Sequence, residues 1–172
     1  MRKTITPSLL LVLAVLSSVP ARAQESRREL KNRYTNIEVA SFNVQRGIDL
    51  PDEYRRTMMA DVIKDLKRIN KFTEVIAEGE VPTLGNAPTI QLVGTVTKYK
   101  HGNRGKRFIA LGLAGDTKVV AHVKFIDKAS GKVLVEADVD GQVYTGLLGG
   151  SPRGAPSGVG KDIAKIAKRI FF

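Results

Sequence analysis

Two runs of alternating apolar and polar residues, separated by a turn at 129–131, give the clearest pattern in the chain. The pattern predicts a β-hairpin with a three-residue loop in which Gly131 takes the left-handed conformation. One face of this hairpin is then wholly apolar, with Val119, Ala121, Val123, Phe125, Val135, Ala137 and Val139 on the same side. On the other face the same register pairs bases with acids, Lys124 with Glu136 and His122 with Asp138. Because a slip of one residue would destroy both patterns, they support a single register.

Two further segments have the spacing of amphipathic helices. The first starts at Pro51, which suits a first helical turn, and its apolar positions are Tyr54, Met58, Val62, Leu66 and Ile69. The second closes the chain after a glycine- and proline-rich loop at 146–160, and its apolar positions are Val159, Ile163, Ile166, Ala167 and Ile170. The opposite stripe of this helix consists of Lys161, Lys165 and Lys168. We predict that the last helix packs on a sheet through its apolar side and does not lie on a membrane.

Shorter alternating stretches predict three more strands, at 37–44, 72–78 and 89–99. The order of elements is therefore strand, helix, strand, strand, hairpin, helix. This order predicts an α+β fold of two layers, in which both amphipathic helices lie on one face of a mixed, largely antiparallel sheet. We expect one domain at 37–172, preceded by a loose basic arm at 24–36.

The amino terminus has the sequence features of a cleaved secretory leader. A basic start at residues 2–3 precedes a short apolar run at 9–16, and small residues at 21–23 include both positions that a signal peptidase reads. We predict a signal peptide at 1–23 and cleavage before Gln24. The apolar run is far shorter than the roughly 20 residues that span a bilayer, so no transmembrane segment is expected after cleavage.

Composition adds a compartment and a class of partner. The chain has no cysteine, so we expect no disulfide, no thiolate metal site and no lipoprotein anchor, as is common for packed domains of the bacterial periplasm. Removing the three positive charges of the leader from the formal net charge of +11 leaves +8. Outside the cytoplasm this charge favours anionic lipid, lipopolysaccharide or an envelope protein as a partner, and nucleic acid is not expected. A second copy of the chain is the other expected partner.

The densest cationic stretch lies between the strand at 89–99 and the hairpin. It consists of Lys98, Lys100, Arg104, Lys106 and Arg107, with Tyr99 and Phe108 interleaved. Nearby glycines can present backbone N–H groups to an anion, so these five cations are the candidate binding residues. The alternative interpretation is a solvated connection without a ligand.

No constellation of residues indicates catalysis. His122 is explained by its cross-strand partner, and His101 lies in a basic glycine-rich loop. Two groups of acids are conceivable as paired carboxylates or calcium ligands. They are Glu74, Glu78 and Glu80, and Glu136, Asp138 and Asp140. Alternating acids on a strand are, however, typical of a solvated face. We expect a binding or assembly module with no catalytic residues, metal or cofactor. The alternative is a hydrolase that acts on envelope polymers.

Four motifs occur in a fixed order: LVGTV at 92–96, GNRGKRF at 102–108, GLAG at 112–115 and IDKASGKVL at 126–134. Over about residues 37–170 the chain thereby resembles the bacterial family of domain of unknown function 4410. The resemblance implies an exported envelope protein without an assigned activity; members are often lipoproteins, and this chain departs from them in lacking a cysteine. The element order is also similar to small periplasmic domains of the curli secretion channel, the Tol-Pal propeller protein and lipoprotein activators of cell-wall synthases, which are assembly and binding modules.

Overall fold

A computed structural model describes residues 28–83, 85–100, 118–142 and 154–172 of the chain. The strands are β1 (Asn36–Val39), β2 (Asn43–Val44), β3 (Glu74–Ala77), β4 (Thr89–Lys100), β5 (Lys118–Asp127) and β6 (Val133–Gln142). The helices that cover the sheet are α2 (Asp52–Arg68) and α4 (Gly154–Phe171).

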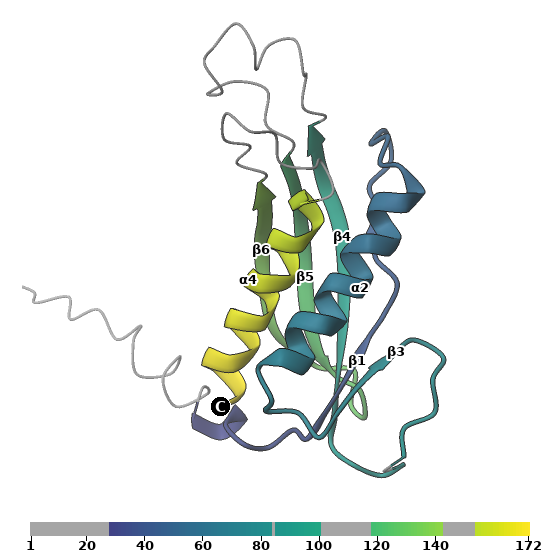
Figure 1. The fold of residues 1–172 in the computed structure, drawn as a ribbon. Coiled ribbons are helices and arrows are strands. Elements are labelled where there is room, and N and C mark those ends of the chain that lie inside the picture. Colours follow the sequence, from purple (N-terminus) through teal and green to yellow (C-terminus); the bar gives the residue numbers. More distant parts are fainter. Residues whose placement is uncertain (1–27, 84, 101–117, 143–153) are drawn as a thin grey trace, which may run out of the picture.

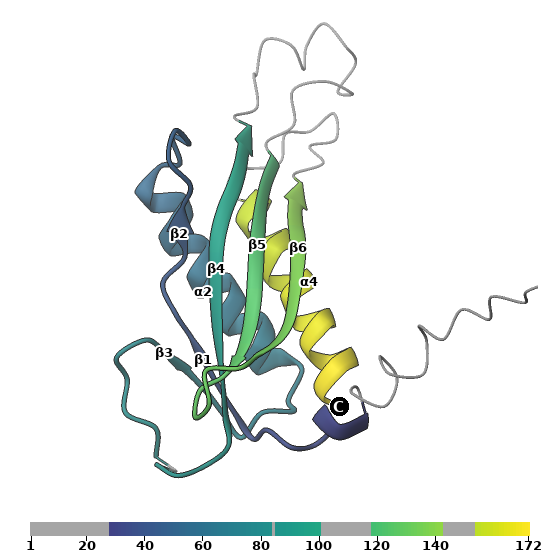
Figure 2. The same ribbon diagram turned by 180° about the vertical axis from the view of Figure 1, so that it is seen from behind.

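The sheet has the strand order β3-β1-β4-β5-β6, and β2 also pairs with β4. Strand β1 runs parallel to β3 and β4, whereas β4, β5 and β6 are antiparallel. Both helices lie on one face of the sheet (Figure 1), and from behind the strands stand in front of them (Figure 2). The predicted α+β fold with a mixed sheet is confirmed, and the sheet is open.

The apolar face of the hairpin forms the centre of the core. Val123 lies opposite Ala137 and Phe125 opposite Val135, as the alternation predicted. This face points toward the helices, which contribute their own buried apolar residues. The buried apolar side chains of β4, β5 and α2 are Ile90, Leu92, Val96, Val119, Ala121, Val123, Phe125, Met58, Val62 and Leu66.

The tip of the hairpin differs from the prediction by one residue. A bulge places Ile126 opposite Val133, so the pairing near the turn is shifted. The amide of Asp127 donates to the carbonyl of Lys132 at 2.9 Å, and the loop therefore spans 128–131 instead of 129–131. Gly131 has a φ of 69°, which confirms its left-handed conformation.

The strand expected at 37–44 is interrupted. The register along β4 shifts by one residue between β1 and β2, and this shift turns Phe42 into the core, where it is 1% exposed. The Phe42 ring lies directly over Gly94, since an ideal Cβ on Gly94 would be 2.2 Å from Cε1 of the ring. Phe42 therefore occupies space that a side chain at position 94 would fill.

Helix α4 starts earlier than the sequence suggested. It begins at Gly154, inside the segment that we expected to be a loop at 146–160. Proline at 156 is compatible with this start, because the first four amides of a helix have no partner within the helix. The apolar side of α4 is buried at Val159, Ile163, Ala167 and Ile170, so the predicted packing of this helix on the sheet is confirmed.

Residues 28–35, the described part of the arm that we expected to be loose, are packed against the fold. Leu30 and Tyr34 are buried. The amide of Asn32 donates to the carbonyl of Phe171 at 2.7 Å, which satisfies a carbonyl that the end of α4 would leave without a partner. The short polar stretch has only two apolar residues at a helical spacing, too few to distinguish it from a free tail in the sequence.

Candidate functional site

The cationic stretch predicted from the sequence is described only in part. Lys98 and Lys100 are exposed at the end of β4 and lie on the sheet face away from the helices. A bulge between Val96 and Lys98 turns Tyr99 to the other face. There the centre of its ring lies 5.7 Å from the centre of the Tyr54 ring. Tyr99 is therefore not part of a surface patch. Three of the predicted binding residues lie outside the described residues: Arg104, Lys106 and Arg107.

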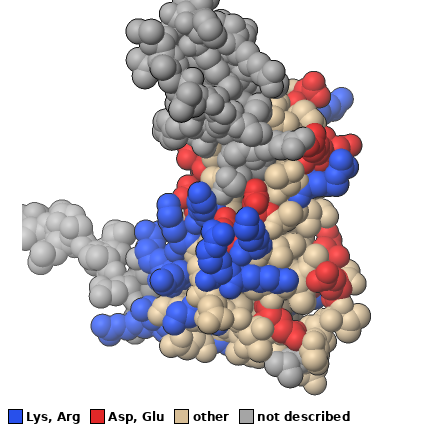
Figure 3. Space-filling view, viewed as in Figure 1, with Lys and Arg blue, Asp and Glu red and all other residues tan. Residues whose placement is uncertain are grey.

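The largest group of described cations lies on the helix layer instead. Apart from Arg55 and Arg56 at the start of α2, eight exposed basic residues belong to α2, to α4 or to the residues directly after α2, and Figure 3 shows basic residues gathered over one half of the layer. We call them the helix-layer cations: Lys64, Lys67, Arg68, Lys71, Lys161, Lys165, Lys168 and Arg169. In the sequence these residues form two separate charged stripes, each typical of the ordinary solvated side of a helix.

Close parallel packing of α2 and α4 unites the two stripes. Gly160 lies against the backbone of α2, since an ideal Cβ on this glycine would be 2.9 Å from the carbonyl oxygen of Asp61. Further along both segments, the rings of Phe72 and Phe172 are 5.0 Å apart. The two helices therefore run side by side in the same direction, and their carboxyl ends lie together (Figure 1).

Few acids balance the helix-layer cations. Arg68 pairs with Asp65 at 2.9 Å, and Lys165 pairs with Asp162 at 2.9 Å. The other six have no ion-pair partner among the residues that the structure describes. Basic residues in the last turns of both helices are also favourable there, because the carboxyl end of a helix carries partial negative charge.

The exposed face of the hairpin is a ladder of paired charges. His122 Nδ1 lies 2.8 Å from Asp138, and Lys124 lies 3.0 Å from Glu136, as the predicted register requires. The hydrogen bond from Lys124 is the main reason why the pKa of Glu136 is lowered. The contact with Asp138 explains His122 as a cross-strand partner. The second histidine, His101, lies outside the described residues.

The acids near β3 act on the backbone of neighbouring loops. Glu74 accepts from the amide of Thr83, Glu78 from Ser41 and Glu80 from Ala77. The amide of Ser41 is the main cause of a lowered pKa for Glu78. In the described part of the chain, no three His, Cys, Asp or Glu residues are grouped so that they could hold a metal ion.

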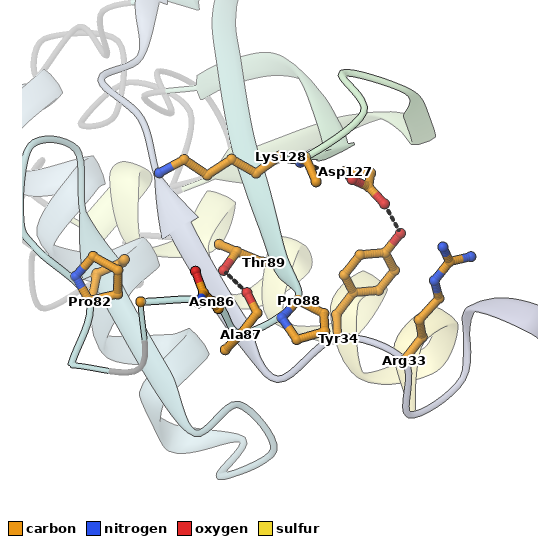
Figure 4. A pocket seen from close by; sticks show the side chains of 12 residues that line it. Arg33, Tyr34, Pro82, Asn86, Ala87, Pro88, Thr89, Asp127 and Lys128 are labelled. Carbon is orange, nitrogen blue, oxygen red and sulfur yellow. Dashed lines mark hydrogen bonds between the residues drawn. The ribbon is translucent and has the colours of Figure 1, made fainter.

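A pocket of about 510 Å³ lies beside the hairpin tip (Figure 4). The arm, the loop before β4 and the hairpin tip form its wall, which includes Arg33, Asn86 and Pro88. Two charged residues of the wall already have partners within the chain, because Asp127 accepts from the Tyr34 hydroxyl at 2.7 Å and Lys128 pairs with Glu38. The wall therefore joins three segments of the fold.

The Tyr34–Asp127 hydrogen bond shifts both pKa values. Burial, together with this hydrogen bond, raises the pKa of Tyr34 from 10.0 to about 12. The same bond and the Ser130 amide lower the pKa of Asp127. Because the pKa of Tyr34 is higher in the folded state, its neutral hydroxyl contributes fully to stability below pH 10. This contribution is lost as the pH rises toward about 12. The lowered Asp127 pKa stabilises the fold at neutral pH and is lost in acid.

Tyr34→Phe is expected to reduce stability at neutral pH and to flatten its alkaline decline. Loss of one hydrogen bond costs about 0.5 to 1.5 kcal/mol, and Asp127 keeps its bonds from the amides of Ala129 and Ser130. Denaturant unfolding of variant and parent, measured at neutral pH and at several values between 10 and about 12, checks both effects. An equally steep alkaline decline in the variant would assign that decline to another group.

One protein family matches more than half of the chain. The family model described as DUF4410, Domain of unknown function, matches residues 34–146. The chain belongs to the DUF4410 family. In this DUF4410 protein the matched range includes every strand and α2, whereas α4 and its four cations lie beyond the end of the match. No curated protein matches the DUF4410 chain.

Solved PelC structures share the fold of this DUF4410 protein. The PelC dodecamer from Paraburkholderia phytofirmans is 19% identical, with a TM-score of 0.52 over 80% of this chain and 88% of that chain. Lipoprotein GNA1162 from Neisseria meningitidis is 15% identical, with a TM-score of 0.46 over 78% of this chain and 99% of that chain. Among the described helices of the DUF4410 chain, none has the length and apolarity to cross a membrane.

Proposed function

We propose that this DUF4410 chain is an exported protein of the bacterial envelope that works by binding, with its helix layer as the contact surface for anionic envelope material. The observation that supports the proposal is the gathering of eight exposed cations on one layer, six of them without an acid partner among the described residues. The leader expected at 1–23 supports export. Its cleavage would remove only residues that precede the described part of the chain.

Cations without an acid partner attract an anionic surface without any change in the fold. Each Lys or Arg near such a surface contributes about 1 kcal/mol at low salt. The attraction weakens as salt rises, because the Debye length shrinks from about 10 Å at 0.1 M to about 3 Å at 1 M. Binding through the helix layer is therefore expected to be salt-sensitive and shared among several residues.

The triple variant Lys161→Gln, Lys165→Gln and Lys168→Gln is expected to lose retention on vesicles or lipopolysaccharide. Loss of three surface charges at about 1 kcal/mol each predicts a decrease in affinity of roughly a hundredfold at low salt. The fold should remain intact, since all three side chains are exposed. Co-sedimentation of the exported protein at several salt concentrations measures the loss, and thermal unfolding measures stability.

The matched control is Lys98→Gln, Lys100→Gln and Lys132→Gln, which removes the same charge from exposed positions away from the helix layer. The proposal expects this control to bind nearly as well as the parent. Equal losses from both triple variants would mean general cationic adhesion. A loss of binding confined to the control would support a binding site at the end of β4, as the sequence predicted.

A second candidate function is assembly of copies of the chain, and the fold similarity to a dodecamer supports it. The chain covers 88% of the PelC chain, so the likeness extends over nearly the whole PelC subunit. Strand β6 also ends the sheet with an edge that pairs only with β5 among the described strands. Native mass spectrometry of the protein from the periplasm would give the number of copies and also the first residue. A monomer at all concentrations would exclude assembly, and a mass that includes Met1 would exclude the cleaved leader.

A further inference from the structure

Five of the helix-layer cations line the contact between α2 and α4, which we call the seam. Gly160, which lies against α2, Ala164 and Lys168 follow one another at intervals of four residues along α4, and Lys161 is seven residues before Lys168, so both lysines are on the side of α4 next to α2. Arg68 lies on the same side of α2 as Asp65, whose carboxylate lies close to Gly160. Lys71 lies 6.0 Å from the ring centre of Phe172 at the end of α4, and Lys64 is one turn before Arg68. The seam cations are Lys64, Arg68, Lys71, Lys161 and Lys168.

On each helix the seam cations follow one another along the helix axis, and we call the two lines together the row. Lys161 and Lys168 are seven residues apart, which corresponds to about 10 Å along a helix at 1.5 Å per residue. The close approach at Gly160 leaves little space between the helices, so a ligand would rest on the row without entering the layer. The other helix-layer cations are Lys67, Lys165 and Arg169, and Lys165 is held by Asp162.

The chemistry of this surface favours one class of ligand. Protein interfaces have an apolar centre, and helices that insert into a bilayer expose an apolar face. Among the described residues, the exposed large apolar side chains are Val81 and Val133, and neither is on a helix. Release of counterions from a polyanion needs no apolar contact, and its contribution grows with the number of cations that the polymer covers.

We propose that the seam cations form a binding site for a linear polyanion, which lies along the seam and contacts both helices. This inference rests on the proposed function of the helix layer and specifies its ligand. A linear chain can place successive anions near the cations of α2 and of α4 at once. A polymer shorter than the row would reach only some of them.

The test uses the exported protein with three probes: long inorganic polyphosphate, tripolyphosphate, and vesicles of equal parts phosphatidylcholine and phosphatidylglycerol. The seam variant carries Lys64→Gln and Lys168→Gln, and the matched control carries Lys67→Gln and Arg169→Gln. Each variant removes one charge from each helix region, and all four side chains are exposed. Titration at several salt concentrations gives the affinity at each concentration. It also gives the slope of the logarithm of the affinity against the logarithm of the salt concentration.

Long polyphosphate is expected to bind more tightly than tripolyphosphate. A single-stranded polyanion contributes a slope of about −0.7 per cation covered. Because Arg68 is paired with Asp65, the four unpaired seam cations predict about −2.8 for the parent and the control, and about −1.4 for the seam variant. Equal slopes in the two variants, or equally tight binding of tripolyphosphate, would overturn the inference. Binding to vesicles without binding to polyphosphate would also overturn it and leave the proposed function standing, whereas binding to no probe would refute both.

Discussion

Replacing Gly94 by valine is expected to destabilise the fold severely. The first side-chain carbon alone would lie 2.2, 2.4 and 2.7 Å from three ring atoms of Phe42, so the ring cannot remain where it is. Removal of a buried phenylalanine from a core costs about 3 to 5 kcal/mol, and overpacking adds about 1 to 3 kcal/mol of strain where the ring moves only partly. The domain as a whole is expected to have a stability of about 5 to 15 kcal/mol, so most of it could be lost.

Denaturant unfolding of the valine variant measures this loss, and two controls identify its cause. Gly85→Val is expected to change little, because a Cβ at Gly85 would meet no atom within 4 Å. The double variant Gly94→Val with Phe42→Ala should be less destabilised than the sum of the single variants, since the new side chain would fill part of the vacated space. Strict additivity would show that Phe42 and Gly94 do not compete for the same volume.

Ile163→Asp is expected to prevent cooperative folding. Ile163 is 0% exposed in the middle of α4, where the new carboxylate would be buried without a partner. Desolvation of an unpaired charge costs several kcal/mol, in addition to the loss of about 1.5 to 3 kcal/mol of apolar burial. Circular dichroism and thermal unfolding would detect the loss of the native state.

Lys165→Asp places the same new group on the exposed side of α4 and is expected to change stability only slightly. Ile163→Val provides a graded comparison and should cost about 0.5 to 1.5 kcal/mol. A folded Ile163→Asp protein that lost only lipid binding would mean that the apolar side of α4 serves a membrane. That outcome would contradict the packing that the structure shows.

Local pattern was sufficient for the hairpin and the two long helices, and for which side of each is buried. The hairpin register could be predicted because a strand alternates with period two, so apolar and charged positions both fix the same alignment of Val123 with Ala137. The buried side of α2 followed in the same way from the spacing of Met58, Val62 and Leu66. The left-handed Gly131 was predictable because turn conformation depends on neighbouring residues.

Contacts between residues distant in sequence decided the rest. The interruption of the strand at 37–44 depends on space beside Gly94, and the burial of Tyr34 depends on Phe171 and Asp127, which no local periodicity encodes. The candidate site shows this most clearly. The lysines of α4 and the bases of α2 each resemble an ordinary solvated stripe in the sequence, about a hundred residues apart. They become one cationic surface only because two parallel helices pack in contact at Gly160, so that charges from both stripes add in space.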